Sequence, residues 1–432
     1  MTLDDRADTL LEVLRRELPA MGFSERAFSV ADIESDMQRM RNLSFDEDNP
    51  VNKVVARLEY NLTKAYLRYV TGQRFGFVDP TIVLNHLDPS KTDSTGRVLG
   101  YTPLYDVEVE HAGDYYTEHA LSKVRKDTLG RYLEQVKPKD AVYNRLLGKL
   151  SSSSEPYRTK LIVNMERRRW REKQQVPVNS KYVLVNIAAF HLWAVGPDSV
   201  TDMRIACGAL KTKTPLLSSS ITHMQVNPEW SIPMSIIRND VARHAGNSSY
   251  FSRHRYYIAD RNGKCVSPES VTQGQLLSGN YRIAQEGGAG NALGSIIFRF
   301  QNKFSVFLHY TSNPSVFNSE NRGVSHGCVR VQHPFELARF LLGNTVDDWT
   351  LDKLRISMRL NPETPKGIDY VSKATDKNNL RLINSLQVTP HVPVFITYYT
   401  VFQNPSTGEL DSYPDVYGYD KVIEQALKTY MK

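Results

Sequence analysis

Cysteine is scarce in this chain: Cys207, Cys265 and Cys328 are the three in 432 residues. They are too few for a disulfide-built scaffold, and none has the CxxC or CxxH spacing of a zinc site. Long apolar runs are also missing, which excludes a membrane-spanning helix of about 18 residues. The first residues, Met1–Arg6, are charged and lack the apolar core of a signal peptide. The sequence therefore predicts neither a membrane span nor a cysteine-bound metal.

The charge balance is basic without being concentrated. Lysine and arginine number 54 against 47 aspartates and glutamates, which gives a net charge of +7. That excess suits an anionic partner such as nucleic acid, a membrane surface or a cell-wall polymer, but it is spread along the chain. Hydrophobic residues make up 41%, so the chain is globular, and its length suggests two or three domains.

The periodicity of apolar residues changes near residue 180. Before 150, apolar residues recur at helical spacing, as in Leu10–Leu18 and Val54–Tyr69, which predicts a mostly helical domain. Ser151–Pro156 is small, polar and ended by proline, as expected of a boundary. From Lys181 onward, β-branched and aromatic runs predict strands. The predicted strands are 182–187, 190–195, 202–207, 296–300, 304–310 and 393–401, and a helix is predicted from Pro334 to a stop at Gly343.

The densest group of reactive side chains lies between residues 309 and 333. His309 ends an apolar run, and Cys328 follows a loop rich in Asn, Ser and Gly. A cysteine becomes a good nucleophile as its thiolate, which a nearby histidine favours. If the loop folds back, the pair can meet, and a thiolate–imidazolium pair should then form below the ordinary thiol pKa. From spacing alone, a buried structural cysteine with surface histidines remains the alternative.

Ser325–Val331, with His309 upstream, resembles the signature of L,D-transpeptidases, the YkuD-type catalytic domain. That signature is a histidine, a loop of roughly 14 to 17 residues, and then [S/T]HGC with an apolar residue. Val226–Pro233 and Gly290–Gly294 resemble two further segments of the family. Gly76–Pro80 is similar to the scaffold domain of its large Gram-negative members.

The resemblance implies a role for each matching residue. Cys328 is the nucleophile, His309 the general base, and the Tyr310 backbone carbonyl orients the imidazole. The N–H groups of Gly327 and Cys328 form the oxyanion hole, and His326 is supporting. Substrate binding is expected of Arg330, Trp230, Asn291, Ser325 and Phe307.

The expected fold is α+β: a helical N-terminal scaffold domain followed by a β-sandwich-like catalytic domain with an inserted lid. We expect the scaffold at 1–150, a linker at 151–180 and the catalytic domain at 181–432. The lid, expected to be largely helical, occupies 231–285.

The resemblance implies an enzyme of peptidoglycan synthesis. It releases D-Ala from tetrapeptide stems, holds the donor as a Cys328 thioester and forms 3→3 cross-links, without metal or organic cofactor. The expected partners are donor and acceptor stem peptides and carbapenem-type inhibitors, with no nucleic acid. The expected location is the bacterial periplasm, with the leader missing from this sequence.

Other readings of the sequence remain open. The same site could serve an endopeptidase, a carboxypeptidase or a lipoprotein-tethering enzyme, and a non-catalytic basic envelope-binding protein is a further alternative. The oligomeric state and a disulfide between Cys207 and Cys265 are also open.

Overall fold

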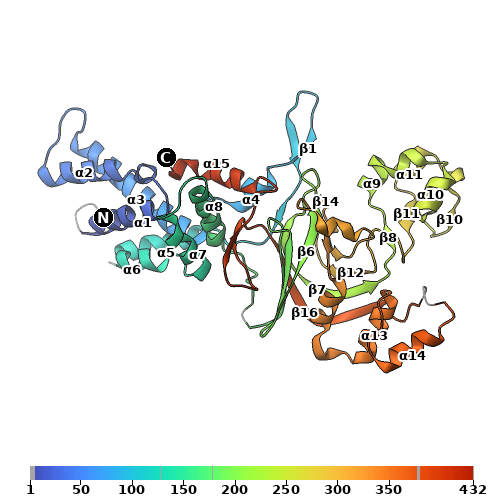
Figure 1. The fold of residues 1–432 in the computed structure, drawn as a ribbon. Helices are drawn as coiled ribbons and strands as arrows, with labels where there is room; N and C mark the ends of the chain where they lie inside the picture. The colour runs from blue at the N-terminus through green and yellow to red at the C-terminus, as the bar shows by residue number, and fades with distance from the viewer. Residues whose placement is uncertain (1–4, 127, 178, 377–379, 432) are drawn as a thin grey trace. The chain divides into compact units, whose positions relative to one another are not determined.

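The computed structural model describes residues 5–126, 128–177, 179–376 and 380–431. The chain divides into two compact units (Figure 1). Unit 1 comprises Met1–Gln175, Pro215–Leu217 and Thr397–Lys432, and unit 2 comprises Val176–Thr214 and Ser218–Ile396.

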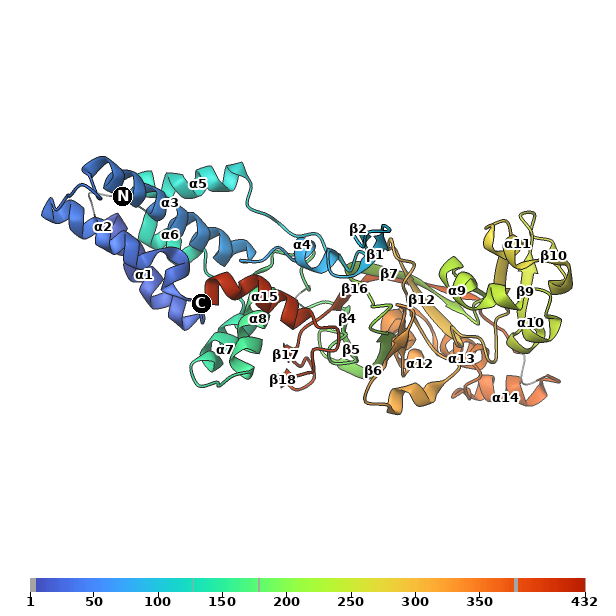
Figure 2. The ribbon, with the colours of Figure 1, turned by 90° about the horizontal axis from the view of Figure 1, so that it is seen from above.

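Unit 1 is built mainly of helices (Figure 2). In α1 (Arg6–Ala20), Leu10, Leu14 and Leu18 lie on one face and are fully buried, as their helical spacing predicts. The helix α3 (Val51–Phe75) ends at Gly76, whose φ of 97° suits glycine. The other helices are α2 (Val30–Asn42), α4 (Pro80–Asn85), α5 (Asp114–Arg125), α6 (Leu129–Gln135), α7 (Ala141–Leu150) and α8 (Tyr157–Arg169). Its short strands are β1 (Pro89–Thr92), β2 (Val98–Tyr101) and β3 (Tyr105–Asp106).

The C-terminal residues from Thr397 onward group with unit 1 by their contacts, although they lie within the range 181–432 predicted for the catalytic domain. They form β17 (Val401–Gln403), β18 (Leu410–Ser412) and α15 (Tyr419–Met431). The cause is side-chain packing: Asp420 pairs with the buried Arg167 of α8 at 2.6 Å. The Tyr430 ring also stacks on Phe23, with 5.6 Å between centroids. Unit 1 is therefore built from segments near both ends of the sequence.

Unit 2 contains a sheet that closes on itself into a barrel-like core. Its strands pair in the order β12–β13–β15–β6–β5–β4–β16–β7, and β7 pairs again with β12. The bounds are β4 (Tyr182–Asn186), β5 (His191–Val195), β6 (Val200–Gly208), β7 (Leu216–Val226), β12 (Ile296–Phe300), β13 (Leu308–His309), β15 (Val329–Val331) and β16 (Ser385–Thr397). A short strand, β14 (Gly323–Ser325), pairs with β6.

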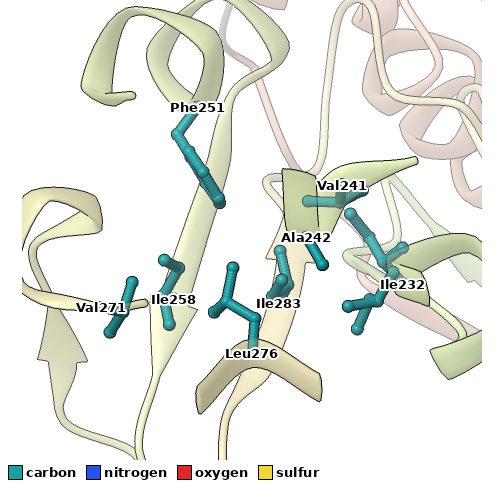
Figure 3. Packing of buried hydrophobic residues seen from close by; sticks show 9 residues of the cluster. Ile232, Val241, Ala242, Phe251, Ile258, Val271, Leu276 and Ile283 are labelled. Carbon is teal, nitrogen blue, oxygen red and sulfur yellow. The ribbon is translucent and has the colours of Figure 1, made fainter. Parts of the chain in front are cut away.

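The inserted segment 231–285 has its own sheet and its own core. The strands β8 (Trp230–Ser231), β9 (Tyr256–Ala259), β10 (Cys265–Val266) and β11 (Arg282–Gln285) form a separate four-stranded sheet. The helices around it are α9 (Met234–Asn239), α10 (Ser248–His254) and α11 (Gln273–Leu277). Between them lies an apolar cluster that includes Phe251, Ile258, Leu276 and Ile283 (Figure 3). The insert is thus mixed rather than largely helical, because its short helices pack on paired strands.

Three helices complete unit 2: α12 (Pro334–Leu342), α13 (Asp348–Ser357) and α14 (Pro365–Lys373). α12 begins and ends where the sequence predicts, at Pro334 and before Gly343. Helical N-terminal residues followed by a β-rich unit confirm the expected α+β class. Over the residues that the structure describes, no helix combines the length and apolarity needed to cross a bilayer.

Candidate active site

One face of four adjoining strands carries the expected catalytic residues. Phe298 of β12 pairs with Leu308 of β13, which pairs with Val329 of β15, and all three are fully buried in the core. Because side chains alternate along a strand, the neighbouring row points to the opposite face. That row contains Gln225, Ile297, His309 and Arg330, paired across β7, β12, β13 and β15. The register therefore sets His309 beside Arg330, and Cys328, two residues before Arg330, on the same face.

His309 is held as a neutral imidazole with a defined tautomer. Its side chain is buried, and Nδ1 contacts the backbone carbonyl of Tyr310. A carbonyl accepts only, so Nδ1 carries the proton and Nε2 is left with its lone pair. Burial lowers the pKa of His309 to about 4, and the Arg330 guanidinium adds to that effect. The imidazole is thus prepared to accept a proton at Nε2.

Cys328 is half-buried and lies at the start of β15. Its neighbour Val329 donates its N–H to the Phe307 carbonyl at 3.0 Å, which fixes the approach of the two strands. The thiol contacts the Ser305 carbonyl, with 3.9 Å between sulfur and oxygen. Burial raises the pKa of the thiol, while the Phe307 N–H, Arg299 and Arg330 oppose that rise.

These two pKa directions differ from the thiolate–imidazolium pair expected from the sequence. Burial disfavours the charged form of each group, so Cys328 is favoured as a thiol and His309 as a neutral base. Among the described residues, the hydrogen-bond partner of the thiol is Ser305 and not His309. Burial therefore favours a neutral resting pair.

A tight turn presents Cys328 to the site. Gly327 has a φ of 116°, a region that favours glycine. The Ser325 hydroxyl donates to the Cys328 carbonyl at 2.5 Å and accepts the Gly327 N–H at 3.1 Å. Thr214 Oγ1 donates to the Gly327 carbonyl at 2.8 Å. The turn is thus held on both sides by buried hydroxyl groups.

The hydrogen bonds of this turn involve two residues with expected roles, Gly327 and Ser325. The Gly327 N–H donates to the Ser325 hydroxyl at 3.1 Å, and this bond competes with the oxyanion role expected of that N–H. Ser325 is only 3% exposed, and both hydrogen bonds of its hydroxyl are to residues of the turn. Among the described residues, the Cys328 N–H has no acceptor.

Arg299 is a site residue that was not among those expected from the sequence. The pairing of β12 with β13 sets it opposite Phe307, and its guanidinium carbon lies 4.5 Å from the centroid of that ring. Its Nε donates to Gln225 Oε1 at 3.0 Å. Arg299 stands two residues after Ile297 in a predicted strand. Residues two apart on a strand share a face, and this spacing was the signal in the sequence that Arg299 lies on the same face as Ile297.

Comparison with known proteins agrees with this geometry. Residues 180–356 match the family described as the L,D-transpeptidase catalytic domain, and residues 1–150 match the scaffold domain family. This chain carries an L,D-transpeptidase catalytic domain. A Haemophilus influenzae protein named "Putative L,D-transpeptidase" is 28% identical over 314 residues. The match covers 71% of this chain and 58% of that relative.

The other residues expected to bind substrate in the transpeptidase domain lie in several places. Phe307 lines the site beneath Arg299. Asn291 is fully buried: its amide donates to the Glu286 carbonyl at 3.0 Å, and its Oδ1 accepts the Leu293 N–H at 2.7 Å. Because these hydrogen bonds are to backbone groups of its own turn, Asn291 stabilises the turn that precedes β12.

Trp230 and His326 lie apart from the row of strand residues. Trp230 opens the insert, where its strand pairs with Gln285 and its side chain packs against the insert's apolar cluster. His326 is exposed on the turn between Ser325 and Gly327. The transpeptidase domain thus brings Cys328, His309, Arg330, Phe307 and Arg299 to one face.

The two other cysteines lie in different environments. Cys207 is fully buried in β6, and Cys265 is exposed in β10 of the insert, with no disulfide between them. Within the described ranges, no group of three or more His, Cys, Asp or Glu side chains is arranged to hold a metal ion.

Proposed function

We propose that this chain is a cysteine L,D-transpeptidase that forms 3→3 cross-links in peptidoglycan. The donor is a tetrapeptide stem, the leaving group is D-Ala, and the intermediate is a thioester on Cys328. The observation that carries the proposal is the row on β13 and β15. There, a neutral histidine with a fixed tautomer shares one face with a cysteine at a constrained turn. The match to the transpeptidase catalytic domain supports the same chemistry.

The first half-reaction forms the thioester. His309 Nε2 takes the proton of the Cys328 thiol as the sulfur attacks the carbonyl between meso-diaminopimelate and D-Ala. The carbonyl electrons move to oxygen, and the Cys328 N–H together with the nearby guanidiniums stabilises that oxyanion. The C–N bond then breaks, His309 returns the proton to the amine, and D-Ala leaves. The thiol–imidazole contact needed for this step forms in the substrate complex.

The second half-reaction resolves the thioester. An amine of a second stem attacks the thioester carbonyl, and His309 takes a proton from that amine. The C–S bond breaks and the sulfur recovers the proton, so the enzyme returns to its neutral pair. Water as acceptor would instead release a tripeptide. On this proposal the partners are stem peptides, and the enzyme acts in the cell envelope, in the periplasm.

The product mixture from one defined substrate tests the proposal. The full chain is incubated with disaccharide-tetrapeptide, and the products are identified by mass spectrometry. Cross-linked dimer with released D-Ala is expected. Tripeptide alone would replace the proposal with a carboxypeptidase, and attachment to a lipoprotein lysine would replace it with a tethering enzyme.

Two cysteine variants give the matched comparison. Cys328→Ala should abolish turnover while preserving the fold, because the nucleophile is lost. Cys265→Ala should retain most activity, because that thiol is exposed on the insert. Substantial cross-linking by Cys328→Ala would overturn the assignment. Binding of glycan that survives Cys328→Ala without any turnover would favour the non-catalytic binding protein.

A further inference from the structure

Two guanidiniums lie at the site without an anionic partner. Arg299 and Arg330 are both half-buried, and neither forms an ion pair with a described residue. The Arg330 Nε is buried and has no hydrogen-bond partner. Arg299 donates from Nε to the neutral Gln225 side chain. Both therefore keep donors that no described residue uses.

The Arg299 and Arg330 guanidiniums both influence the Cys328 thiol and the His309 imidazole. Both affect the pKa of Cys328 and of His309, and the strand register puts all four residues on one face of the sheet. Burial lowers the pKa of each guanidinium. Desolvating two like charges without a counter-ion is costly, and an anion bound between them would offset that cost.

Strand pairing determines where Arg299 and Arg330 lie. Arg299 stands on β12 opposite Phe307, and Arg330 stands on β15 opposite His309, so β13 separates the two arginines on one face. The Phe307 ring supports the Arg299 guanidinium from below. Among the described residues, no acidic side chain pairs with either guanidinium, so their outer N–H groups remain for a ligand.

We propose that Arg299 and Arg330 form a carboxylate-binding site beside Cys328 that selects the donor stem peptide. Guanidinium groups bind carboxylates through paired N–H donors, which a lysine cannot reproduce. The inference rests on the proposed function, because a tetrapeptide donor offers two such groups near the attacked bond. One is the terminal carboxylate of the leaving D-Ala, and the other is the free carboxylate of the diaminopimelate side chain.

Binding to an inactive chain tests the site without requiring turnover. Cys328→Ala is titrated calorimetrically with three tetrapeptides: unmodified, amidated at the terminal carboxylate, and amidated on diaminopimelate. Amidation of the recognised carboxylate should weaken binding by at least about ten-fold. The amidated peptide that binds more weakly identifies which carboxylate the site recognises. Equal affinity for all three peptides would overturn the inference.

Arginine variants connect the selectivity to this site. In the Cys328→Ala background, Arg299→Gln should weaken binding of the unmodified peptide and leave binding of the sensitive amidated peptide nearly unchanged. Arg299→Lys, which keeps the charge without the paired donors, should fall between them. Arg339→Gln, which removes an exposed arginine paired with Glu336 on α12, is the matched control and should change neither affinity. Equal weakening of both peptides by Arg299→Gln and Arg299→Lys would assign Arg299 a structural role and overturn the inference.

These outcomes separate the inference from the proposed function. Carboxylate-selective binding without dimer formation by the parent chain would leave the site in place and reject the transpeptidase reaction. Dimer formation without carboxylate selectivity would support the transpeptidase reaction and reject the carboxylate-binding site.

Discussion

At the scale of single residues, burial determines the protonation of the reacting pair. Burial favours the neutral form of both Cys328 and His309. The Tyr310 carbonyl fixes which imidazole nitrogen holds the proton. A neutral thiol beside a neutral base reacts by proton transfer during attack, because no thiolate is stored in advance.

This neutral pair predicts the pH profile of acylation by a carbapenem. His309, with a pKa of about 4, remains a competent base throughout pH 5 to 9 and is lost only as pH falls through about 4. Alkylation by iodoacetamide, which needs the free thiolate, should instead rise through and beyond the ordinary thiol pKa of about 8.5. Intact-protein mass against pH and time measures both reactions. A plateau of alkylation well below pH 8 would show the charged pair instead.

Two histidine variants assign the base in the same experiment. His309→Ala should slow carbapenem acylation by about 100-fold or more, the usual contribution of a positioned base. His326→Ala should have a smaller effect, because His326 is exposed on the turn. The parent should take up one adduct per chain. The opposite ranking of the two variants would transfer the base role to His326.

At the scale of elements, local hydrogen bonds decided where strands begin. The run 304–310 was predicted as one strand, yet β13 covers only Leu308–His309. Asn302 Oδ1 accepts the N–H groups of Phe304 and Val306, which bends the chain into a turn before the strand. By contrast, β12 has the predicted bounds because its alternating apolar residues pair on both sides.

The Ser325 hydroxyl is the element-scale support for Cys328. Ser325→Ala removes both hydrogen bonds across the turn and leaves the buried Gly327 N–H without its acceptor. We expect a loss of about 1–3 kcal/mol in the free energy of unfolding and a larger relative loss in acylation rate. Urea unfolding and carbapenem uptake measure the two effects. Ser372→Ala, on the exposed face of α14, is the control, and a Ser325→Ala chain equal to it in both assays would remove the support role.

At the scale of the whole molecule, stability is distributed over separate apolar cores. The insert packs Phe251 among its own strands and helices (Figure 3). Phe298, in contrast, lies in the core of the closed sheet. Segments with separate cores can open separately.

Reciprocal core variants test this independence. Phe251→Ala should cost the insert about 3–5 kcal/mol and increase amide exchange over 231–285, while β12 and β13 keep their protection. Phe298→Ala should show the reverse pattern. Hydrogen exchange read by mass spectrometry distinguishes the segments. Loss of protection in both regions with either variant would mean that they unfold as one unit.

The sequence by itself determined the α+β class, the helix at Pro334 and the family of the catalytic domain, because these depend on local periodicity and on a motif of adjacent residues. It also named Cys328 and His309, since their types and spacing express the chemistry directly. Only the tertiary structure decided that Arg299 joins them and that residues 397–432 belong with unit 1. It also decided that the Gly327 N–H is bonded to Ser325 and that the insert contains a sheet. Each of these depends on contacts between segments far apart in the chain, which strand register and side-chain packing create and local sequence does not encode.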